Sequence, residues 1–551
     1  MAIRKLAVII NSNSNEDEYL LVKQTPPPKF GEEEYDSYID SDLWDLPSTT
    51  LNPLVGGVSH KSEFYIENAE SCSSKLNLKI LDVESALKQV LSEVGFHGRG
   101  EICEKWVFQK YDEEAEFGPG PPTQTIFIFG KLGAEIEMIP NVSKWVSIQS
   151  CRNLLLEVNP NSDRVGPLAA VGLLNDHLHC GRCKVPSPLR YQEYPPGVTL
   201  VPMKSKTQKP FLTTNLVVIA PDNVTGSRGG SDFSVYGDAL IMDPGCHFEG
   251  HTELMEIVAS LPRKLVVFVT HHHYDHVEGL SVIQKCNPDA TLLAHENTMR
   301  HIGKDHWSLG YTAISGAEAI CIGGERLNVI FAPGHTDGHM ALLHVRTNSL
   351  IVGDHCVGQG SAILDIQSGG NMKAKKYELV SKSVLILEHL IFMQDYFETT
   401  YKFLELSPHA LIPMHGKVNL WPKHMLCGYL KNRRNRELSI LKAMEDGAET
   451  LFDIVAKVYS DVDPSYWIPA SSNVRIHVEH LAQQDKLPKD FSVEKFQSTC
   501  RLHFLQRWIW VFLKNGASFQ YQKLGKVKLF FAAAVAGFAM LYAVKRKIVT
   551  K

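Results

Sequence analysis

The chain has 551 residues and a formal net charge of −5, and 44% of its residues are hydrophobic while 21% are charged. This composition is ordinary for a globular protein and leaves room for about three domains. Because the overall charge is slightly negative, it excludes a chain that attracts nucleic acid along its whole length.

Residues 1–150 are predicted to form a separate α/β unit, with short strands followed by a helix over residues 82–94. This unit resembles a Nudix domain. The stretch that aligns with the family's helix motif, residues 88–95, keeps only Glu93 of three expected carboxylates. Since Mg²⁺ needs several oxygen ligands, we expect a degenerate Nudix-like domain without pyrophosphatase activity. An unrelated α/β domain is the alternative.

Residues 151–190 are predicted to connect this unit to the next domain, because a turn-forming stretch and several prolines punctuate them. They include His177, His179, Cys180 and Cys183, a pattern that a small zinc knuckle would use. No second cysteine pair follows at the spacing of a zinc finger. We therefore expect no metal at this place.

The run 271–276 reads His-x-His-x-Asp-His and directly follows an apolar stretch that predicts a buried strand. A strand presents alternate side chains on one face, so His271 and His273 are expected to point at one metal ion. The following turn would bring Asp275 and His276 to a second ion. Imidazole and carboxylate groups suit zinc at neutral pH.

Three further ligand types follow at the ends of predicted strands, each beside a glycine that permits a turn: His335, Asp354 and His415. The end of a sheet can gather residues that are distant in sequence, so these side chains are expected to join the histidine run. Neighbouring histidines are expected to face away or to support the site without binding metal: His272, His339 and His355.

These motifs together resemble the metallo-beta-lactamase superfamily, and Asp243 after an earlier apolar run resembles the first motif of that family. Within the superfamily, residues 333–340 and 353–358 are similar to the lactamase-beta-like endoribonuclease branch. The resemblance spans roughly residues 195–490. It implies an α/β fold in which residues 191–430 form a catalytic αββα sandwich.

The resemblance also implies the ligands and the cofactor, which is two Zn²⁺ per chain. One zinc would be held by His271, His273 and His335, and the other by Asp275, His276 and His415. Asp354 would bridge the two ions, and a hydroxide shared between them would attack the substrate. Asp275 and Asp354 are the predicted catalytic residues, and Asp275 is in addition a candidate acceptor for a proton of the attacking water.

Cleavage of phosphodiester bonds in single-stranded RNA is the leading predicted activity, by resemblance to the endoribonuclease branch. A glyoxalase II-like thioesterase or small-ester hydrolase is the alternative, because the same hydroxide attacks an acyl carbon. A membrane-tethered binding protein with a structural metal site is a third hypothesis, which the full ligand set argues against. Iron or manganese in one site stays open, since related ligand sets accept them.

The C-terminal part is basic, since positions 417–551 hold 22 basic and 11 acidic residues. This favours an anionic partner, either RNA or a membrane surface. Residues 431–490 resemble the winged-helix-like piece of the endoribonuclease branch, and their basic start at 431–436 is a candidate phosphate contact. Whether residues 373–394 are a genuine insert stays open.

Residues 491–528 are predicted to be an amphipathic, basic linker that leads to a tail helix. Residues 529–544 are apolar and flanked by lysines, which is a short but workable membrane span when the lysines reach the bilayer surface. We therefore predict a tail anchor in the plastid or mitochondrial outer membrane, with the enzyme facing the cytosol. Eleven irregularly spaced cysteines and the absence of a secretory signal agree with an intracellular compartment.

Overall fold

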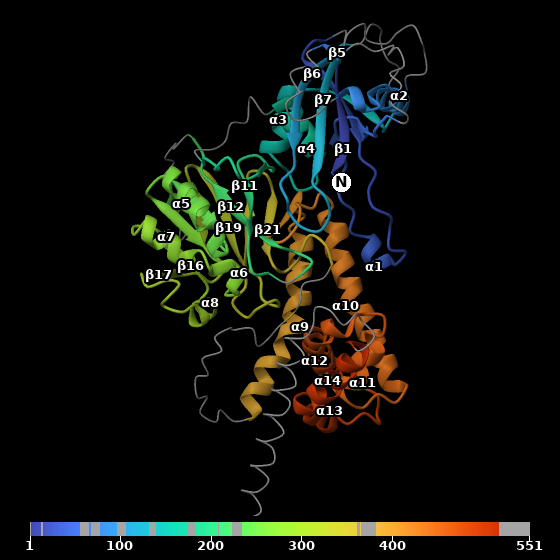
Figure 1. Cartoon of the computed structure of the whole chain (residues 1–551), viewed down its shortest axis with the longest axis vertical. Helices are drawn as coiled ribbons and strands as arrows, with labels where there is room; N and C mark the ends of the chain where they lie inside the picture. The colour runs from blue at the N-terminus through green and yellow to red at the C-terminus, as the bar shows by residue number, and fades with distance from the viewer. Residues whose placement is uncertain are drawn as a thin grey trace, which may run out of the picture. The chain divides into compact units, whose positions relative to one another are not determined.

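The structure is a computed structural model, and its residues divide into two compact units, Met1–Asn435 and Arg436–Lys551 (Figure 1). The residues that it describes are 2–12, 15–54, 66–67, 78–95, 106–131, 139–174, 183–207, 209–222, 234–360, 364 and 382–516. Most of the proposed zinc knuckle, residues 373–381 of the segment 373–394 and the whole of residues 529–544 lie outside this part of the chain.

The N-terminal part of the first unit is built on a mixed nine-stranded sheet. Its strands are β1 (Ile3–Asn11), β2 (Glu18–Lys23), β3 (Leu43–Asp45), β4 (Ser48–Thr50), β5 (Ile66–Glu67), β6 (Trp106–Glu113), β7 (Thr123–Lys131), β8 (Ser143–Ser147) and β9 (Arg164–Val165). Its helices are α1 (Glu33–Asp36), η2 (Leu78–Ile80), α2 (Val83–Glu93), α3 (Ile148–Leu156), α4 (Pro167–Ala169) and η3 (Ala170–Leu174).

Strand β1 is buried on both faces and separates two cores. Leu6 and Val8 pack with α2, whereas Ala7 and Ile9 pack with α3, as the alternation of side chains along a strand requires. On the solvent side of α2, Gln89 donates a hydrogen bond to Glu93 at 3.0 Å. The Nudix-like assignment of this α/β/α layer stays a prediction.

Two sheets that pack face to face follow the N-terminal part. The first contains β10 (Gln192–Glu193), β11 (Thr199–Lys204), β12 (Thr213–Ile219), β14 (Ala239–Met242), β15 (Leu265–Phe268), β16 (Thr291–Ala294) and β17 (Tyr311–Ala313), in that order. The second contains β13 (Ser234–Gly237), β18 (Ala319–Ile322), β19 (Glu325–Phe331), β20 (Met340–His344), β21 (Ser349–Gly353) and β22 (Ala410–Pro413). Their helices are η5 (Phe248–Gly250), α5 (His251–Ser260), α6 (Tyr274–Val277), α7 (Leu280–Cys286), α8 (Glu296–His301), α9 (Lys382–Glu405) and α10 (Pro422–Glu445).

The layering of this sandwich can be followed along β15. Val266 and Phe268 point into the core between the two sheets, whereas Leu265 and Val267 pack in the core that contains α5 and α7. Parallel strands covered on both faces have such continuous apolar sequences. The predicted αββα sandwich is therefore confirmed.

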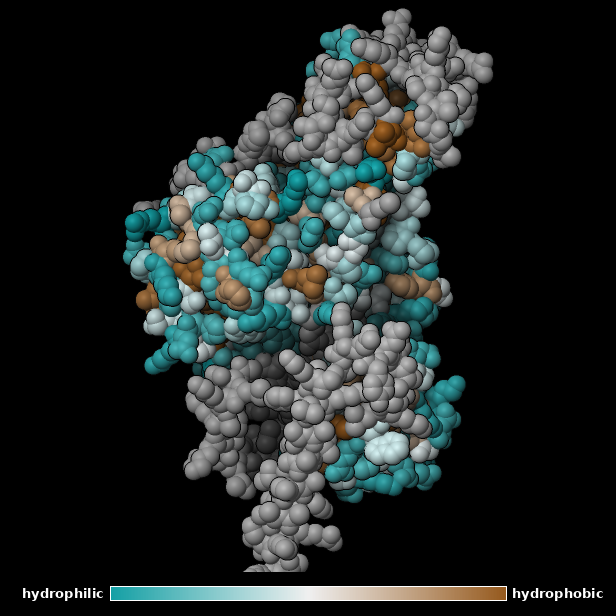
Figure 2. Space-filling model, viewed as in Figure 1, coloured by the Kyte–Doolittle hydropathy of each residue, from teal (hydrophilic) through white to brown (hydrophobic). Residues whose placement is uncertain are grey.

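Hydrophilic side chains cover most of the described surface on the face in Figure 2, with hydrophobic ones between them.

Helices are the elements of the second unit among its described residues. It contains α11 (Leu451–Val458), η6 (Pro464–Tyr466), α12 (Trp467–Gln483), α13 (Val493–Thr499) and α14 (Leu502–Gly516). Phe504 and Trp508 of α14 are buried in the core of this unit. Over residues 491–516 the structure thus differs from the predicted linker 491–528, because the apolar side of α14 faces this core, and residues 517–528 lie outside the described part.

The predicted membrane association requires correction. Among the residues that the structure describes, no helix combines the length and the apolar character needed to cross a bilayer. The prediction relied on residues 529–544, an apolar run that is shorter than the ~20 residues that a span normally takes. Neither the tail anchor nor the location on a plastid or mitochondrial outer membrane is supported, and we withdraw both.

Arg164 of β9 connects the N-terminal part to the sandwich. Its side chain is buried, and its guanidinium donates to the backbone oxygens of Ser41 at 2.6 Å, His409 at 3.1 Å and Leu420. It also lies over the ring of Trp421, with 5.0 Å from Cζ to the ring centroid. Since His409 and Leu420 flank β22, this single side chain fixes β22 against the N-terminal part.

Replacing Arg164 with methionine is expected to lower the free energy of unfolding by about 2–3 kcal/mol, because the buried carbonyl oxygens lose their donor. Denaturant unfolding of the full chain measures the change. Arg152→Met, on the exposed side of α3, is the control and should shift the midpoint little. Equal shifts in the two variants would show that Arg164 has no special role.

Candidate metal centre

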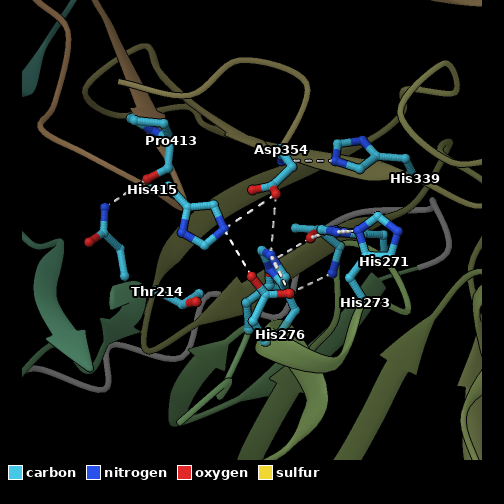
Figure 3. Close-up of polar contacts among 12 residues, drawn as sticks. Thr214, His271, His273, His276, His339, Asp354, Pro413 and His415 are labelled. Atoms are coloured by element: carbon cyan, nitrogen blue, oxygen red, sulfur yellow. Dashed lines mark hydrogen bonds and ion pairs between the residues drawn. The ribbon is translucent and has the colours of Figure 1, made fainter. Parts of the chain in front are cut away.

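The predicted site residues come from strand ends that meet at one edge of the sandwich. His271, His273, Asp275 and His276 follow β15, while Asp354 follows β21. The structure brings all seven predicted ligands to this place, and Figure 3 shows His276, Asp354 and His415 facing one another. The two remaining strand ends are those of β19, which leads to His335, and β22, which leads to His415.

His271, His273 and His335 form the first group. The distance from His271 Nε2 to His273 Nδ1 is 3.0 Å, and His335 Nε2 lies 3.3 Å and 3.1 Å from these two atoms. Nitrogens that bind one zinc ion tetrahedrally are about 3.3 Å apart. The group therefore has the dimensions of a zinc site.

Asp275, His276 and His415 form the second group, whose ligand atoms lie within 4.8 Å of one another. Asp354 stands between the groups. Its Oδ2 lies 3.4 Å from His276 Nε2, 3.3 Å from His415 Nε2 and 3.9 Å from His335 Nε2. A carboxylate in this position has the reach to contact an ion in each group.

Buried atoms without hydrogen bonds indicate that the site is built for cations. Within the described part of the chain, the Nε2 atoms of His276 and His415 and Oδ1 of Asp354 are buried and make no hydrogen bond. Both Nε2 atoms lie within ion-pair distance of Asp354 Oδ2 but make no hydrogen bond, and buried polar atoms normally make one, so the three atoms fit a site for metal ions. Two divalent ions would satisfy them, and the nitrogen and carboxylate donors suit zinc.

The protonation of the histidines differs between the groups. Burial and the neighbouring histidines hold the pKa values of His271 and His335 well below the usual value, which keeps both neutral, as metal binding requires. Burial also lowers the pKa of His415, but the carboxylates of Asp354 and Asp275 outweigh it and raise the pKa to about 10. In the protein alone, His415 therefore carries a proton where a metal ion would bind.

Hydrogen bonds behind the ligands fix the side of each imidazole that faces the centre. Asp243 Oδ2 accepts from His276 Nδ1 at 2.9 Å and from the Thr270 hydroxyl at 2.5 Å. The same hydroxyl lies 2.9 Å from His271 Nδ1 and can accept its proton. His415 Nδ1 donates to the backbone oxygen of Thr213 at 2.8 Å. Nε2 of each ring is thus left for a metal ion.

Asp243 was recognised in the sequence only as part of a motif, and its role is visible only in three dimensions. It adopts a positive φ of 47°, which a residue other than glycine adopts at a cost. This backbone conformation and the hydrogen bonds to Thr270 hold its carboxylate beside His276. A signal for this role existed in the sequence, since Asp243 ends a predicted strand.

Two of the three histidines not expected to bind metal contact other parts of the structure. His272 stacks on His301 with the ring centroids 4.3 Å apart, and His355 pairs with the Thr400 hydroxyl at 2.8 Å. The third, His339, accepts a hydrogen bond at Nε2 from the backbone N–H of Asp354 at 3.2 Å. His339 thus holds the backbone of the bridging residue.

The fold and the site define a class of protein, an αββα sandwich with clustered histidine and aspartate side chains that could hold metal ions at one edge. Two family models match the sequence. The metallo-beta-lactamase superfamily matches residues 235–388, and the beta-lactamase associated winged helix domain matches residues 450–491. The chain therefore carries a metallo-beta-lactamase superfamily domain followed by its associated winged helix domain. The endoribonuclease branch stays a prediction.

Similar proteins cover part of the chain. A beta-lactamase-like protein 2 homolog of Drosophila melanogaster is 24% identical over 40% of this chain and 69% of its own length. The atrochrysone carboxyl ACP thioesterase AgnL7 of Paecilomyces divaricatus is 24% identical over 35% of this chain and 54% of its own length. A hydroxyacylglutathione hydrolase of Gloeobacter violaceus is 34% identical over 18% of this chain and 38% of its own length. The chain thus spans less than two thirds of the latter two relatives.

Replacing Asp243 with asparagine is expected to weaken metal binding about 10–100-fold, because the amide cannot accept from both Thr270 and His276 as the carboxylate does. Competition with a chromophoric chelator measures the affinity of the full chain for zinc. Asp289→Asn, at an exposed site, is the control and should bind zinc like the unchanged protein. Unchanged affinity in Asp243→Asn would contradict the role given to Asp243.

Proposed function

We propose that the chain is a dinuclear, zinc-dependent hydrolase that cleaves acyl thioesters or related esters. The observation that carries the proposal is the pair of ligand groups joined by Asp354. The substrate class is supported by the relatives named as a thioesterase and as hydroxyacylglutathione hydrolases. A thiol also leaves readily as its anion, since its pKa is near ~8.5, so the reaction needs no strong acid group.

We assign the seven predicted ligands their predicted roles, with two Zn²⁺ per chain. When bound, the ions would activate water and stabilise the negative charge that develops on the substrate oxygen. Asp354 and Asp275 supply the negative charge that balances the ions. Asp275 is in addition the proposed acceptor of the water proton, because its side chain is 15% exposed and so reachable by solvent.

Cleavage of single-stranded RNA is the second candidate, because of the resemblance to the endoribonuclease branch. The basic run 431–436 was its predicted phosphate contact, but charges in this run are already paired. Lys431 lies 2.8 Å from a carboxylate oxygen of Glu32, and Arg434 lies 2.8 Å from one of Glu34. RNA would have to compete with these carboxylates, so we rank RNA below thioesters.

The two activities can be separated with the purified full chain loaded with zinc. We expect hydrolysis of an acyl-glutathione thioester, its loss after chelation, its return with zinc, and little cleavage of single-stranded RNA. His273→Ala should lower kcat/KM about 100-fold or more, because it removes a ligand. His272→Ala is the matched control on the same loop, since its ring stacks on His301 instead.

Cleavage of RNA without thioester hydrolysis would reverse the order of the two candidates. An activity that survives both chelation and His273→Ala would reject the dinuclear hydrolase altogether.

The role of Asp275 in proton transfer has its own test. Asparagine keeps an oxygen that can contact a metal but cannot accept the proton, so Asp275→Asn should lower kcat about 100-fold. Metal content, measured on the same sample, should stay near two zinc ions per chain. Full turnover in a variant that retains both ions would rule out the proton transfer and leave Asp275 as a ligand only.

A further inference from the structure

The loop between β6 and β7 belongs to the N-terminal sheet but packs inside the metallo-beta-lactamase sandwich. Ala115 and Phe117 of this loop are each 1% exposed, and they lie in the core between the two sheets together with Ile412 and Met414. Figure 1 shows the loop extending from β6 and β7 toward β21. The N-terminal part therefore supplies side chains to the core beside the strand end that carries His415.

Polar contacts connect the same loop to the backbone around His415. Glu114 pairs with Lys417, with 2.6 Å between Oε2 and Nζ. The Thr213 hydroxyl lies 3.5 Å from the backbone oxygen of Glu116, and the backbone oxygen of Thr213 accepts the hydrogen bond from His415 Nδ1. Lys417, which follows β22, and Thr213, which accepts from His415, thus both contact the loop.

Phe211 fills the space between the loop and His415. Its ring centroid lies 5.6 Å from that of His415. A Cβ atom added to Gly118 of the loop would lie 2.9 Å from Cδ1 of Phe211, and one added to Gly416 would lie 3.3 Å from Cε1. The ring therefore lies close to the loop, to the ring of His415 and to the backbone next to His415.

We propose that the N-terminal part positions the second metal group through this loop. Phe117 fills the end of the sandwich core. Phe211 and Lys417 contact both the loop and the segment around His415, so a shift of the loop would shift His415. The inference rests on the proposed function, because it takes His415 as a metal ligand. Phe117, Phe211 and Glu114 are positioning residues, since they touch no reacting atom.

Two glycines of the loop provide a matched pair of variants. Gly118 and Gly120 have positive φ angles of 151° and 109°, so alanine strains the backbone at both. A Cβ at Gly118 would press on Phe211, whereas one at Gly120 would meet no atom within 4 Å. We therefore expect both variants to lose thermal stability, Gly118→Ala the more, but a loss of metal affinity only in Gly118→Ala.

The affinity of the full chain for zinc is measured by chelator competition, which reads the metal centre without an activity assay. We expect one of the two ions to bind about tenfold more weakly in Gly118→Ala. When Phe211 is already replaced with alanine, Gly118→Ala should weaken zinc binding no further, because the ring that the new Cβ atom would contact is absent. Equal zinc affinities in Gly118→Ala and Gly120→Ala would overturn the proposal.

Should Gly118→Ala fail to fold, Glu114→Gln takes its place. Its control is Glu84→Gln, because the Glu84–Lys88 pair is 27% and 52% exposed and the Glu114–Lys417 pair is 21% and 49% exposed. A weaker second zinc ion in Glu114→Gln alone supports the proposal, and equal affinities overturn it. If the proposed function itself is wrong, the unchanged protein would hold no pair of zinc ions. That outcome is distinct from equal zinc affinities in the two variants.

Discussion

The close packing of nitrogen and carboxylate groups at one buried edge is the constraint on which the site depends. When all three imidazoles present a lone pair, as metal binding requires, their nitrogens lie within 3.3 Å of one another and repel, and two neighbouring carboxylates are only partly balanced by protons on histidine. Such a cluster costs free energy in an apolar interior unless cations occupy it. The surrounding sandwich has to supply that free energy, and its rigid strand ends keep the groups together.

Rigidity at this edge comes from contacts that leave no room for a side chain. Gly353 has a positive φ of 59°, and a Cβ atom there would collide with His339, the residue that holds the backbone of Asp354. Gly245 is in a similar position, since a Cβ atom would overlap the backbone of Asp275. The two carboxylates of the centre are thus located by backbone packing, and the imidazoles by hydrogen bonds.

Much of the site could be predicted because its ligands follow strands. Alternation placed His271 and His273 on one side, and apolar runs ending at His335, Asp354 and His415 pointed to one edge of a sheet. Asp243 also follows a predicted strand, but its hydrogen bonds to Thr270 and His276 are visible only in the structure. The loop between β6 and β7 could not be predicted in this way, since it follows no periodicity or spacing rule. The membrane helix was predicted from an apolar run and its flanking lysines, and that run is shorter than the ~20 residues that a span normally takes.

Through the loop between β6 and β7, the N-terminal part contacts the sandwich that carries the metal centre. This structural role does not require an active site in the N-terminal part. If the N-terminal part is the Nudix-like domain that its sequence resembles, Glu93 alone of the motif's carboxylates remains on α2, which offers few oxygen ligands for Mg²⁺. The same part nevertheless buries Phe117 in the neighbouring core and holds β22 through Arg164. Both contacts act on the strand that ends at His415. In our proposal the N-terminal part is therefore a fixed portion of the metal centre's framework.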